Sequence, residues 1–111
     1  MTFPNGKKYV GEWNVGIPNG QGIETSPDGE MYLGEWRDGK KDGKGIFISK
    51  NGDKYVGEYK DGEKDGEGTY TYSDGSEYLG EYEIDKRWIG ILYDKNGNIQ
   101  DKIVNGKWTG Y

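Results

Sequence analysis

Short alternations of apolar and polar residues, separated by turn dipeptides, run along most of the chain. The segments 9–13, 32–36 and 55–59 read YVGEW, YLGEW and YVGEY, and a fourth, YLGEY, occupies 78–82. Glycines at this density exclude a stable helix. Asn-Gly and Asp-Gly dipeptides recur alternately about 10 and 13 residues apart, which is typical of β-hairpins. The pattern predicts an all-β fold, an antiparallel meander of about eight to ten short strands.

The alternation repeats with a fixed period. Tyr9, Tyr32, Tyr55 and Tyr78 are each 23 residues apart, and so are the Gly and Glu that follow them. A period in this range indicates a repeat architecture. Side chains alternate between faces and 23 is odd, so the aromatic residues stay on one face only if each unit has one odd-length turn or one bulge. The predicted units, each of two strands and two turns, are about 9–31, 32–54, 55–77 and a degenerate 78–99.

The glycines have two predicted uses. Glycine in a left-handed conformation closes turns and bulges, which we assign to Gly16, Gly39 and Gly62, just before the second strand of each unit. Gly43 and Gly45 lie inside a second strand, where glycine marks a close approach. We expect aromatic rings to lie over such glycines.

The fourth copy departs from the pattern. It reaches its next turn one residue early and has Asp85 in the glycine position. Because an open sheet edge must be covered, terminal repeats are commonly atypical. We therefore predict a cap over 83–111, ending in a hairpin of about 98–111 around Asn105-Gly106, with Trp108 and Tyr111 folding back. At the other end FPNG aligns with SPDG, so a longer array, of which this sequence is an excerpt, remains an alternative.

Composition narrows the possible functions. Hydrophobic residues make up only 31 % and glycine supplies 21 positions, but ten Tyr and four Trp provide large apolar areas for a thin ordered structure. The chain has no Cys and no His, which removes thiolates, imidazoles and the usual zinc ligands. A net charge of −5 argues against nucleic acid as a partner. No apolar run is long enough for a transmembrane segment, and the N-terminus lacks a signal-peptide pattern. We expect a cytoplasmic location, with peripheral membrane contact as an alternative.

These motifs resemble the MORN (membrane occupation and recognition nexus) repeat, whose pattern is close to Tyr-x-Gly-Glu-Trp-x-x-Gly-Lys-x-x-Gly-x-Gly. Three copies match nearly throughout, and the resemblance covers about residues 3–100. It implies an elongated, twisted single-layer sheet of successive hairpins. It also implies scaffolding, dimerisation, and contact with membranes or phosphoinositides. The catalytic domains that accompany such arrays in longer proteins have no counterpart in this sequence.

Two groups of residues are candidate binding sites. An aromatic ladder is either a core or a partly open groove for a peptide or a lipid. Its members are Tyr9, Trp13, Tyr32, Trp36, Tyr55, Tyr59, Tyr78 and Tyr82. A basic cluster around one hairpin is either a solvated turn or a contact for anionic lipid. Its members are Arg37, Lys40, Lys41 and Lys44.

The acidic residues are weaker candidates. The repeated Glu residues lie two strands apart, about 10 Å, which is too far for a shared proton, so we expect them to accept hydrogen bonds from neighbouring turns or strands. Residues 94–98, DKNGN, hint at a calcium loop but lack its sixth-position Gly and its twelfth ligand, so we expect a plain hairpin turn. No catalytic residue, metal site or cofactor is predicted. The predicted function is a non-catalytic scaffold for a protein partner or for self-assembly, and the alternative is a peripheral membrane or phosphoinositide-binding module.

Overall fold

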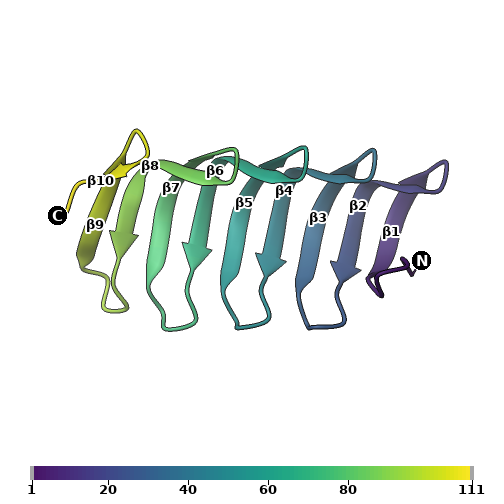
Figure 1. Ribbon diagram of the computed structural model, residues 1–111, viewed down its shortest axis with the longest axis horizontal. Coiled ribbons are helices and arrows are strands. Elements are labelled where there is room, and N and C mark those ends of the chain that lie inside the picture. Colours follow the sequence, from purple (N-terminus) through teal and green to yellow (C-terminus); the bar gives the residue numbers. More distant parts are fainter. Residues whose placement is uncertain (1, 111) are drawn as a thin grey trace.

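The computed structural model describes residues 2–110, and these form one antiparallel sheet of ten strands in sequence order without a helix (Figure 1). Each strand from β2 to β9 is therefore hydrogen-bonded to the strand before it and the strand after it, and β1 and β10 are the edges. The predicted meander is confirmed. The strands are β1 (Lys8–Asn14), β2 (Ile17–Thr25), β3 (Met31–Arg37), β4 (Lys40–Ile48), β5 (Lys54–Lys60), β6 (Glu63–Thr71), β7 (Glu77–Glu83), β8 (Lys86–Tyr93), β9 (Ile99–Val104) and β10 (Lys107–Trp108).

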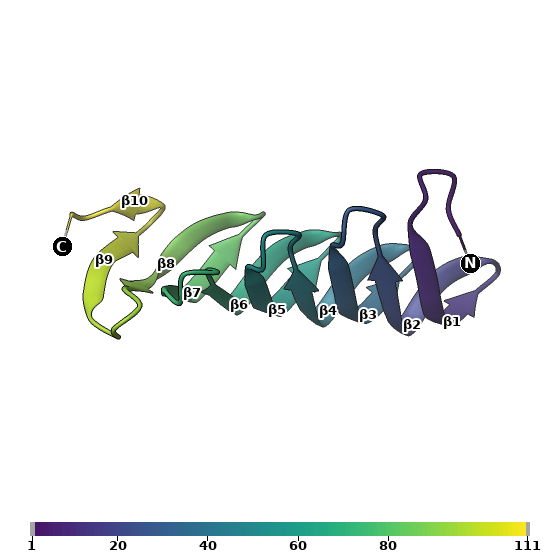
Figure 2. The same ribbon diagram turned by 90° about the horizontal axis from the view of Figure 1, so that it is seen from below.

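The sheet is elongated, with extents of 49 × 25 × 19 Å. Its strands run across the long axis, so β1 and β10 lie at opposite ends (Figure 1). The view in Figure 2 shows a single curved layer with no second sheet or helix over either face. Within residues 2–110 no helix offers the length and apolarity that a membrane crossing requires.

The register explains the odd period of 23. In the second unit, β3 has seven residues, a two-residue turn follows, β4 has nine, and a five-residue turn over 49–53 leads to β5. The two-residue turn is left-handed at both positions, with φ of 50° at Asp38 and 83° at Gly39, the geometry that suits twisted hairpins. The left-handed role of Gly39 is therefore confirmed. The odd count comes from the five-residue turn and not from this one.

The pairing within each of the hairpins β1–β2, β3–β4, β5–β6 and β7–β8 is interrupted by a register shift. Between Gly34 and Trp36 of β3, the partner strand β4 contributes two extra residues. Gly43 lies there with φ of 94°, and a Cβ on it would collide with the Glu35 carboxylate. The expectation of a ring over Gly43 is therefore wrong. The ring expectation holds for Gly45, where a Cβ would collide with Tyr32.

The core is a chain of aromatic rings on one face. Successive centroids from Tyr9 through Trp36, Tyr32 and Tyr59 to Tyr55 lie 5.2–5.4 Å apart in edge-to-face contacts, and the series continues through Tyr82 to Tyr78. Such contacts contribute about 0.5–1.5 kcal/mol each beyond the burial of area. The four tyrosines that open the motifs are at most 1 % exposed. The rings therefore supply the burial that the scarce aliphatic residues do not.

The last unit is shorter, as its sequence indicates. Its two-residue turn uses Ile84 and Asp85, both with positive φ, and β8 has one residue fewer than β4 or β6. The register shift opposite Tyr82 is accordingly one residue and not two. The hairpin at Asn105-Gly106 joins β9 to β10, and Trp108 packs 6.3 Å from Tyr78. The predicted folding back of Tyr111 lies outside the described residues.

Candidate functional site

A row of glycines crosses the middle of the sheet. In the register of β1–β8, each strand places one glycine directly opposite the glycine of its neighbour. On one face tyrosine rings cover this row. A side chain at these positions would point to the tyrosine face, so on the other face the row is bare backbone and forms a low floor between the taller rows on either side. The row consists of Gly11, Gly22, Gly34, Gly45, Gly57, Gly68, Gly80 and Gly90.

Two rows of side chains border this floor on the face away from the tyrosines. One, which we call the aliphatic row, consists of aliphatic side chains and one threonine, and the register places them side by side on consecutive strands. Its members are Val10, Ile23, Leu33, Ile46, Val56, Thr69, Leu79 and Ile91. The other contains an acidic row, Glu58, Glu67 and Glu81, between Lys44 at one end and Ile89 at the other. The rows lie two residues apart along each strand, about 6.6–6.8 Å.

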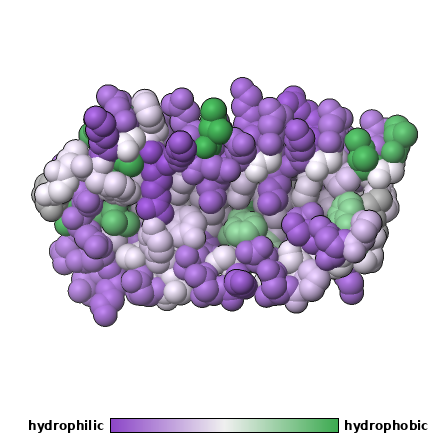
Figure 3. All heavy atoms as spheres, in the orientation of Figure 1, coloured by the Kyte–Doolittle hydropathy of each residue, from purple (hydrophilic) through white to green (hydrophobic). Residues whose placement is uncertain are grey.

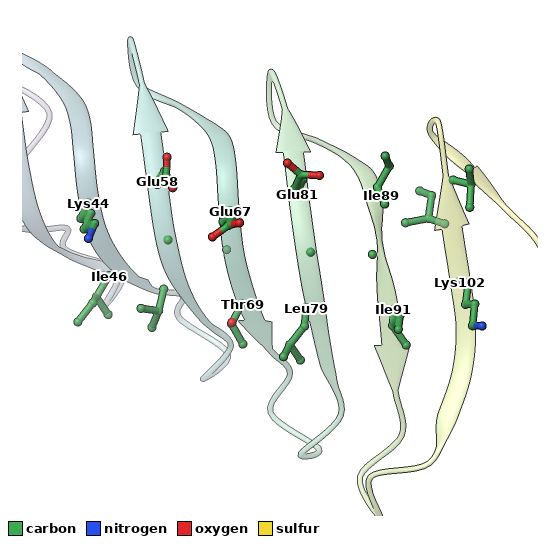
Figure 4. A pocket seen from close by; sticks show the side chains of 18 of the residues that line it. Lys44, Ile46, Glu58, Glu67, Thr69, Leu79, Glu81, Ile89, Ile91 and Lys102 are labelled. Atoms are coloured by element: carbon green, nitrogen blue, oxygen red, sulfur yellow. The ribbon is translucent and has the colours of Figure 1, made fainter.

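Floor and rows together form a groove of about 1110 Å³ that extends from Leu33 to Val104. Figure 4 shows the side chains of both rows standing up on either side of a bare strip. Its strands run in the opposite left-to-right order from Figure 1 with the same turns at the top, so the groove is on the far face in Figure 1. Val56 is 43 % exposed and Leu79 is 42 % exposed. The groove is thus apolar surface open to solvent.

The predicted aromatic site lies on the opposite face and is mostly inaccessible. Of its eight rings, seven are 7 % exposed or less, and Trp13 is 49 % exposed. A ligand could reach the seven rings only by displacing the residues that cover them. Figure 3 shows that hydrophilic side chains cover most of this face. The structure brings the predicted ladder together, and its geometry is that of a core.

Cations cover the rings at intervals of 23 residues, which the sequence reasoning missed. Lys41 Nζ lies 5.2 Å from the Tyr32 ring and 5.1 Å from Phe47. Lys64 Nζ lies 5.3 Å from Tyr55. The guanidinium of Arg87 lies 4.7 Å from Tyr78. Burial lowers the pKa of Lys41 and of Lys64 from the usual lysine value. The shared spacing of 41, 64 and 87 was the signal available in the sequence.

The predicted basic cluster is divided by the sheet. Lys41 is on the aromatic face, whereas Lys44 borders the groove on the other face. Arg37 is paired, with its Nη2 3.2 Å from Asp42 and 3.9 Å from Asp61. Lys40 begins β4 and is exposed. These four cations do not form one basic patch.

Two of the repeated Glu residues, Glu12 and Glu35, accept backbone N–H groups where the register shifts. The Glu12 carboxylate accepts the N–H of Gln21 at 2.7 Å, and Glu35 accepts the N–H of Lys44 at 2.6 Å. The expectation of hydrogen bonds from a neighbouring strand is confirmed for these two. Residues 94–98 form a five-residue turn in which Asp94 accepts backbone N–H groups, as expected for a plain turn. No cluster suited to a metal ion occurs among residues 2–110.

This geometry defines a class of protein, an array of β-hairpin repeats with an aromatic core on one face and an open groove on the other. The sequence matches the MORN repeat at residues 9–31, 32–54 and 55–77. The matched segments make up more than half of the chain, and the chain belongs to the MORN-repeat family. A comparison with characterised proteins gives no match. The family is one of repeat modules for interaction or membrane association, so the fold defines the kind of surface and not its partner.

Proposed function

We propose that this chain is a non-catalytic scaffold whose groove holds a segment of a partner protein. The observation that carries the proposal is the aliphatic row, which stays open to solvent along a sheet that no second layer covers. Contiguous exposed apolar surface of this kind is typical of interaction sites. The groove also crosses several strands of the sheet, and this length favours binding of a long segment over binding of a small molecule.

A peptide selection tests the proposal. The immobilised protein is used to select binders from a random peptide library, and the binders are then measured on the variants Val56→Asp and Leu79→Asp. A charge in the apolar wall is expected to weaken their binding at least tenfold, because a carboxylate would have to be desolvated.

The matched control is Val15→Asp, which makes the same exchange at an exposed site outside the groove. Position 15 has a φ of 51°, and Asp occupies the equivalent turn position at 38 and 61, so this change suits the backbone. Binding that survives in both groove variants would contradict the proposal, and so would a selection that yields no binder.

The membrane alternative has less geometric support. Its predicted lipid contacts are split between the two faces, one is paired with two aspartates, and the chain is acidic overall. Co-sedimentation with neutral and phosphoinositide-containing liposomes, at low and high salt, tests it. Binding to the anionic liposomes that falls at high salt would favour the membrane role over the protein-binding role.

A further inference from the structure

The groove is asymmetric. On one side of the glycine floor the wall is apolar as far as Lys102 on β9, and on the other side it is acidic from Glu58 to Glu81. Ile46 and Leu79 stand on one side, and Glu67 and Glu81 stand on the other (Figure 4). We infer that the groove binds an amphipathic α-helix of a partner protein, with aliphatic residues on one face and a row of Lys or Arg along one flank. The inference rests on the proposed function, because it specifies the partner segment.

Backbone hydrogen bonding favours a helix over an extended peptide. The groove crosses β3–β9, and each of these strands already has a hydrogen-bonded neighbour on both sides. An extended segment lying in the groove would find no free ladder to join, and its own N–H and C=O groups would lose water without gaining partners. A helix satisfies its backbone internally and binds through side chains alone.

The spacing of the groove matches helical spacing. Neighbouring strands are about 4.8 Å apart, close to the 5.4 Å rise of one helical turn. Leu33, Val56 and Leu79 recur on every second strand, about 10 Å apart, close to the rise over seven helical residues. From β3 to β9 the groove spans about six strand spacings, or about 29 Å. A helix of about 19 residues covers that length.

The acidic row sets the charge of the partner. Glu67 and Glu81 lie directly opposite each other on β6 and β7, and like charges in this position destabilise a sheet. Among the described residues, neither has a cationic partner within 4.0 Å. A Lys or Arg of the partner would relieve this repulsion. Glu58, Glu67 and Glu81 occupy consecutive strands, which fits cations spaced i, i+4 and i+7 on a helix.

The opposite flank of the groove shows no such preference. The row beyond the aliphatic side chains runs through Met31, Ile48, Lys54, Thr71 and Glu77. Its one cation and one carboxylate leave no net charge. The basic residues are therefore expected on one flank of the helix only, the flank that lies beside the acidic row.

Designed peptides test the inference. Three 19-residue helical peptides share one leucine face and carry Lys, Glu or Gln at the same three flank positions, and a fourth has the Lys sequence with two central prolines. Affinity is measured by fluorescence anisotropy at low and high salt. We expect the Lys peptide to bind at least tenfold tighter than the Glu peptide, with a difference in affinity that is smaller at high salt. We expect the proline peptide to bind at least tenfold more weakly than the Lys peptide.

Charge reversal in the groove supplies the decisive variant. Glu81→Lys is expected to lower the affinity for the Lys peptide at least tenfold and to raise the affinity for the Glu peptide. Its thermal midpoint is expected to stay level or rise, because a Glu–Glu pair becomes a Glu–Lys pair, so a loss of binding would not reflect unfolding. Glu83→Lys, on the same strand but outside the groove, is the control and should change either affinity less than threefold.

Failure of this inference can be distinguished from failure of the proposed function. Two results would overturn the basic helix but keep the groove as a protein site, provided that Leu79→Asp weakens the binding. One is equal affinity for the Lys, Glu and Gln peptides. The other is equal affinity for the Lys peptide and the proline peptide. Tight binding of the Lys peptide that Leu79→Asp leaves intact would overturn both. A dimer of the protein alone that Leu79→Asp dissolves would identify a second copy as the occupant and overturn the inference.

Discussion

At the scale of single residues, the fold depends on positions where no side chain fits. Gly68 lies under the ring of Tyr55, and a Cβ placed on it would be 2.5 Å from Cε1 of that ring. Tyr55 is fully buried, and its hydroxyl donates to the carbonyl oxygen of Glu58 at 2.9 Å. Burial and this hydrogen bond therefore hold the ring over the glycine. A glycine inside a strand, such as Gly68, is required by the packing of the ring and is not a source of flexibility.

Gly68→Ala is expected to lower the free energy of unfolding by about 2–3 kcal/mol, because overpacking forces the ring or the backbone to move. Urea unfolding measures the change. The control is Gly62→Asn, where a Cβ meets nothing within 4 Å and Asn tolerates the left-handed φ of 87°. A stability of Gly68→Ala equal to that of the control would contradict the role assigned to the ring.

Sequence reasoning reached the residues of the core but not those of the groove. The Tyr-x-Gly-Glu spacing and the turn dipeptides predict the strands and the ring over Gly45, since these follow from local geometry. The groove could not be predicted from the motif, because its aliphatic residues occupy the x position between Tyr and Gly, which the motif leaves unspecified. Val10, Leu33, Val56 and Leu79 occupy that position, and alternation places them on the face opposite the tyrosines.

At the scale of elements, the two-residue turns show how uneven the repeats are. The turns at 38–39 and 61–62 are Asp-Gly, whereas the first unit has Val15-Gly16. Val15 takes a φ of 51°, a conformation that costs a β-branched residue more than it costs Asp or Asn. Its side chain is 94 % exposed, so no packing compensates for this. The first hairpin is therefore held together less well than its neighbours.

Val15→Asn is expected to raise the free energy of unfolding by about 1 kcal/mol, because it removes backbone strain without loss of buried contacts. Thermal and urea unfolding both report it. Val10→Asn, which makes the same exchange in an extended strand position, should have the opposite sign. A destabilised Val15→Asn variant would show that the strain at this turn has been overestimated.

At the scale of the whole molecule, each unit contacts only its neighbours. Strands that follow one another in the sequence pair with one another, so the array is modular in one dimension. The capping end was only partly predictable. Its hairpin at 105–106 follows from Asn-Gly, but the contacts of Arg87 with the rings of Tyr72, Tyr78 and Trp108 depend on residues brought together by the register of β6–β10.

Deletion of residues 32–54 is expected to leave a folded protein with two strands fewer, because Met31 then precedes Tyr55 as it precedes Tyr32. The urea m-value should fall by about a fifth, in proportion to the buried surface, and the groove should bind a 19-residue helix more weakly. Deletion of 55–77 gives a chain of equal length and serves as the comparison. A disordered circular dichroism spectrum for both would contradict modularity.

Alkaline pH is expected to unfold the protein through its tyrosines. Burial, followed by the nearby Tyr82, raises the pKa of Tyr78 to about 12, and burial also raises the pKa of Tyr32, Tyr55 and Tyr59 above the usual 10. Between pH 10 and 12 the unfolded chain releases protons that the folded chain keeps. Stability therefore falls by about 1.4 kcal/mol per pH unit for each such tyrosine.

The buried lysines have the opposite effect on the pH dependence of stability, and they act at slightly lower pH than the tyrosines. The folded pKa of Lys41 and of Lys64 is lowered, so the unfolded chain binds more protons just below 10.5 and stability rises with pH there. We expect stability to rise slightly with pH up to about 10 and to fall steeply above 10.5, measured by urea unfolding across this range. A stability that stays constant to pH 12 would contradict the burial of the tyrosine hydroxyls.

The orientation of the strands across the long axis also determines how the array responds to force. Tension applied between the first and last strands acts along the interstrand hydrogen bonds, because those bonds point along the 49 Å axis. Such a load opens bonds one after another, as a zipper opens, and does not shear a whole strand at once. Held by its two ends, the array should extend hairpin by hairpin at low tension, in steps of about one repeat, and act as a compliant mechanical element.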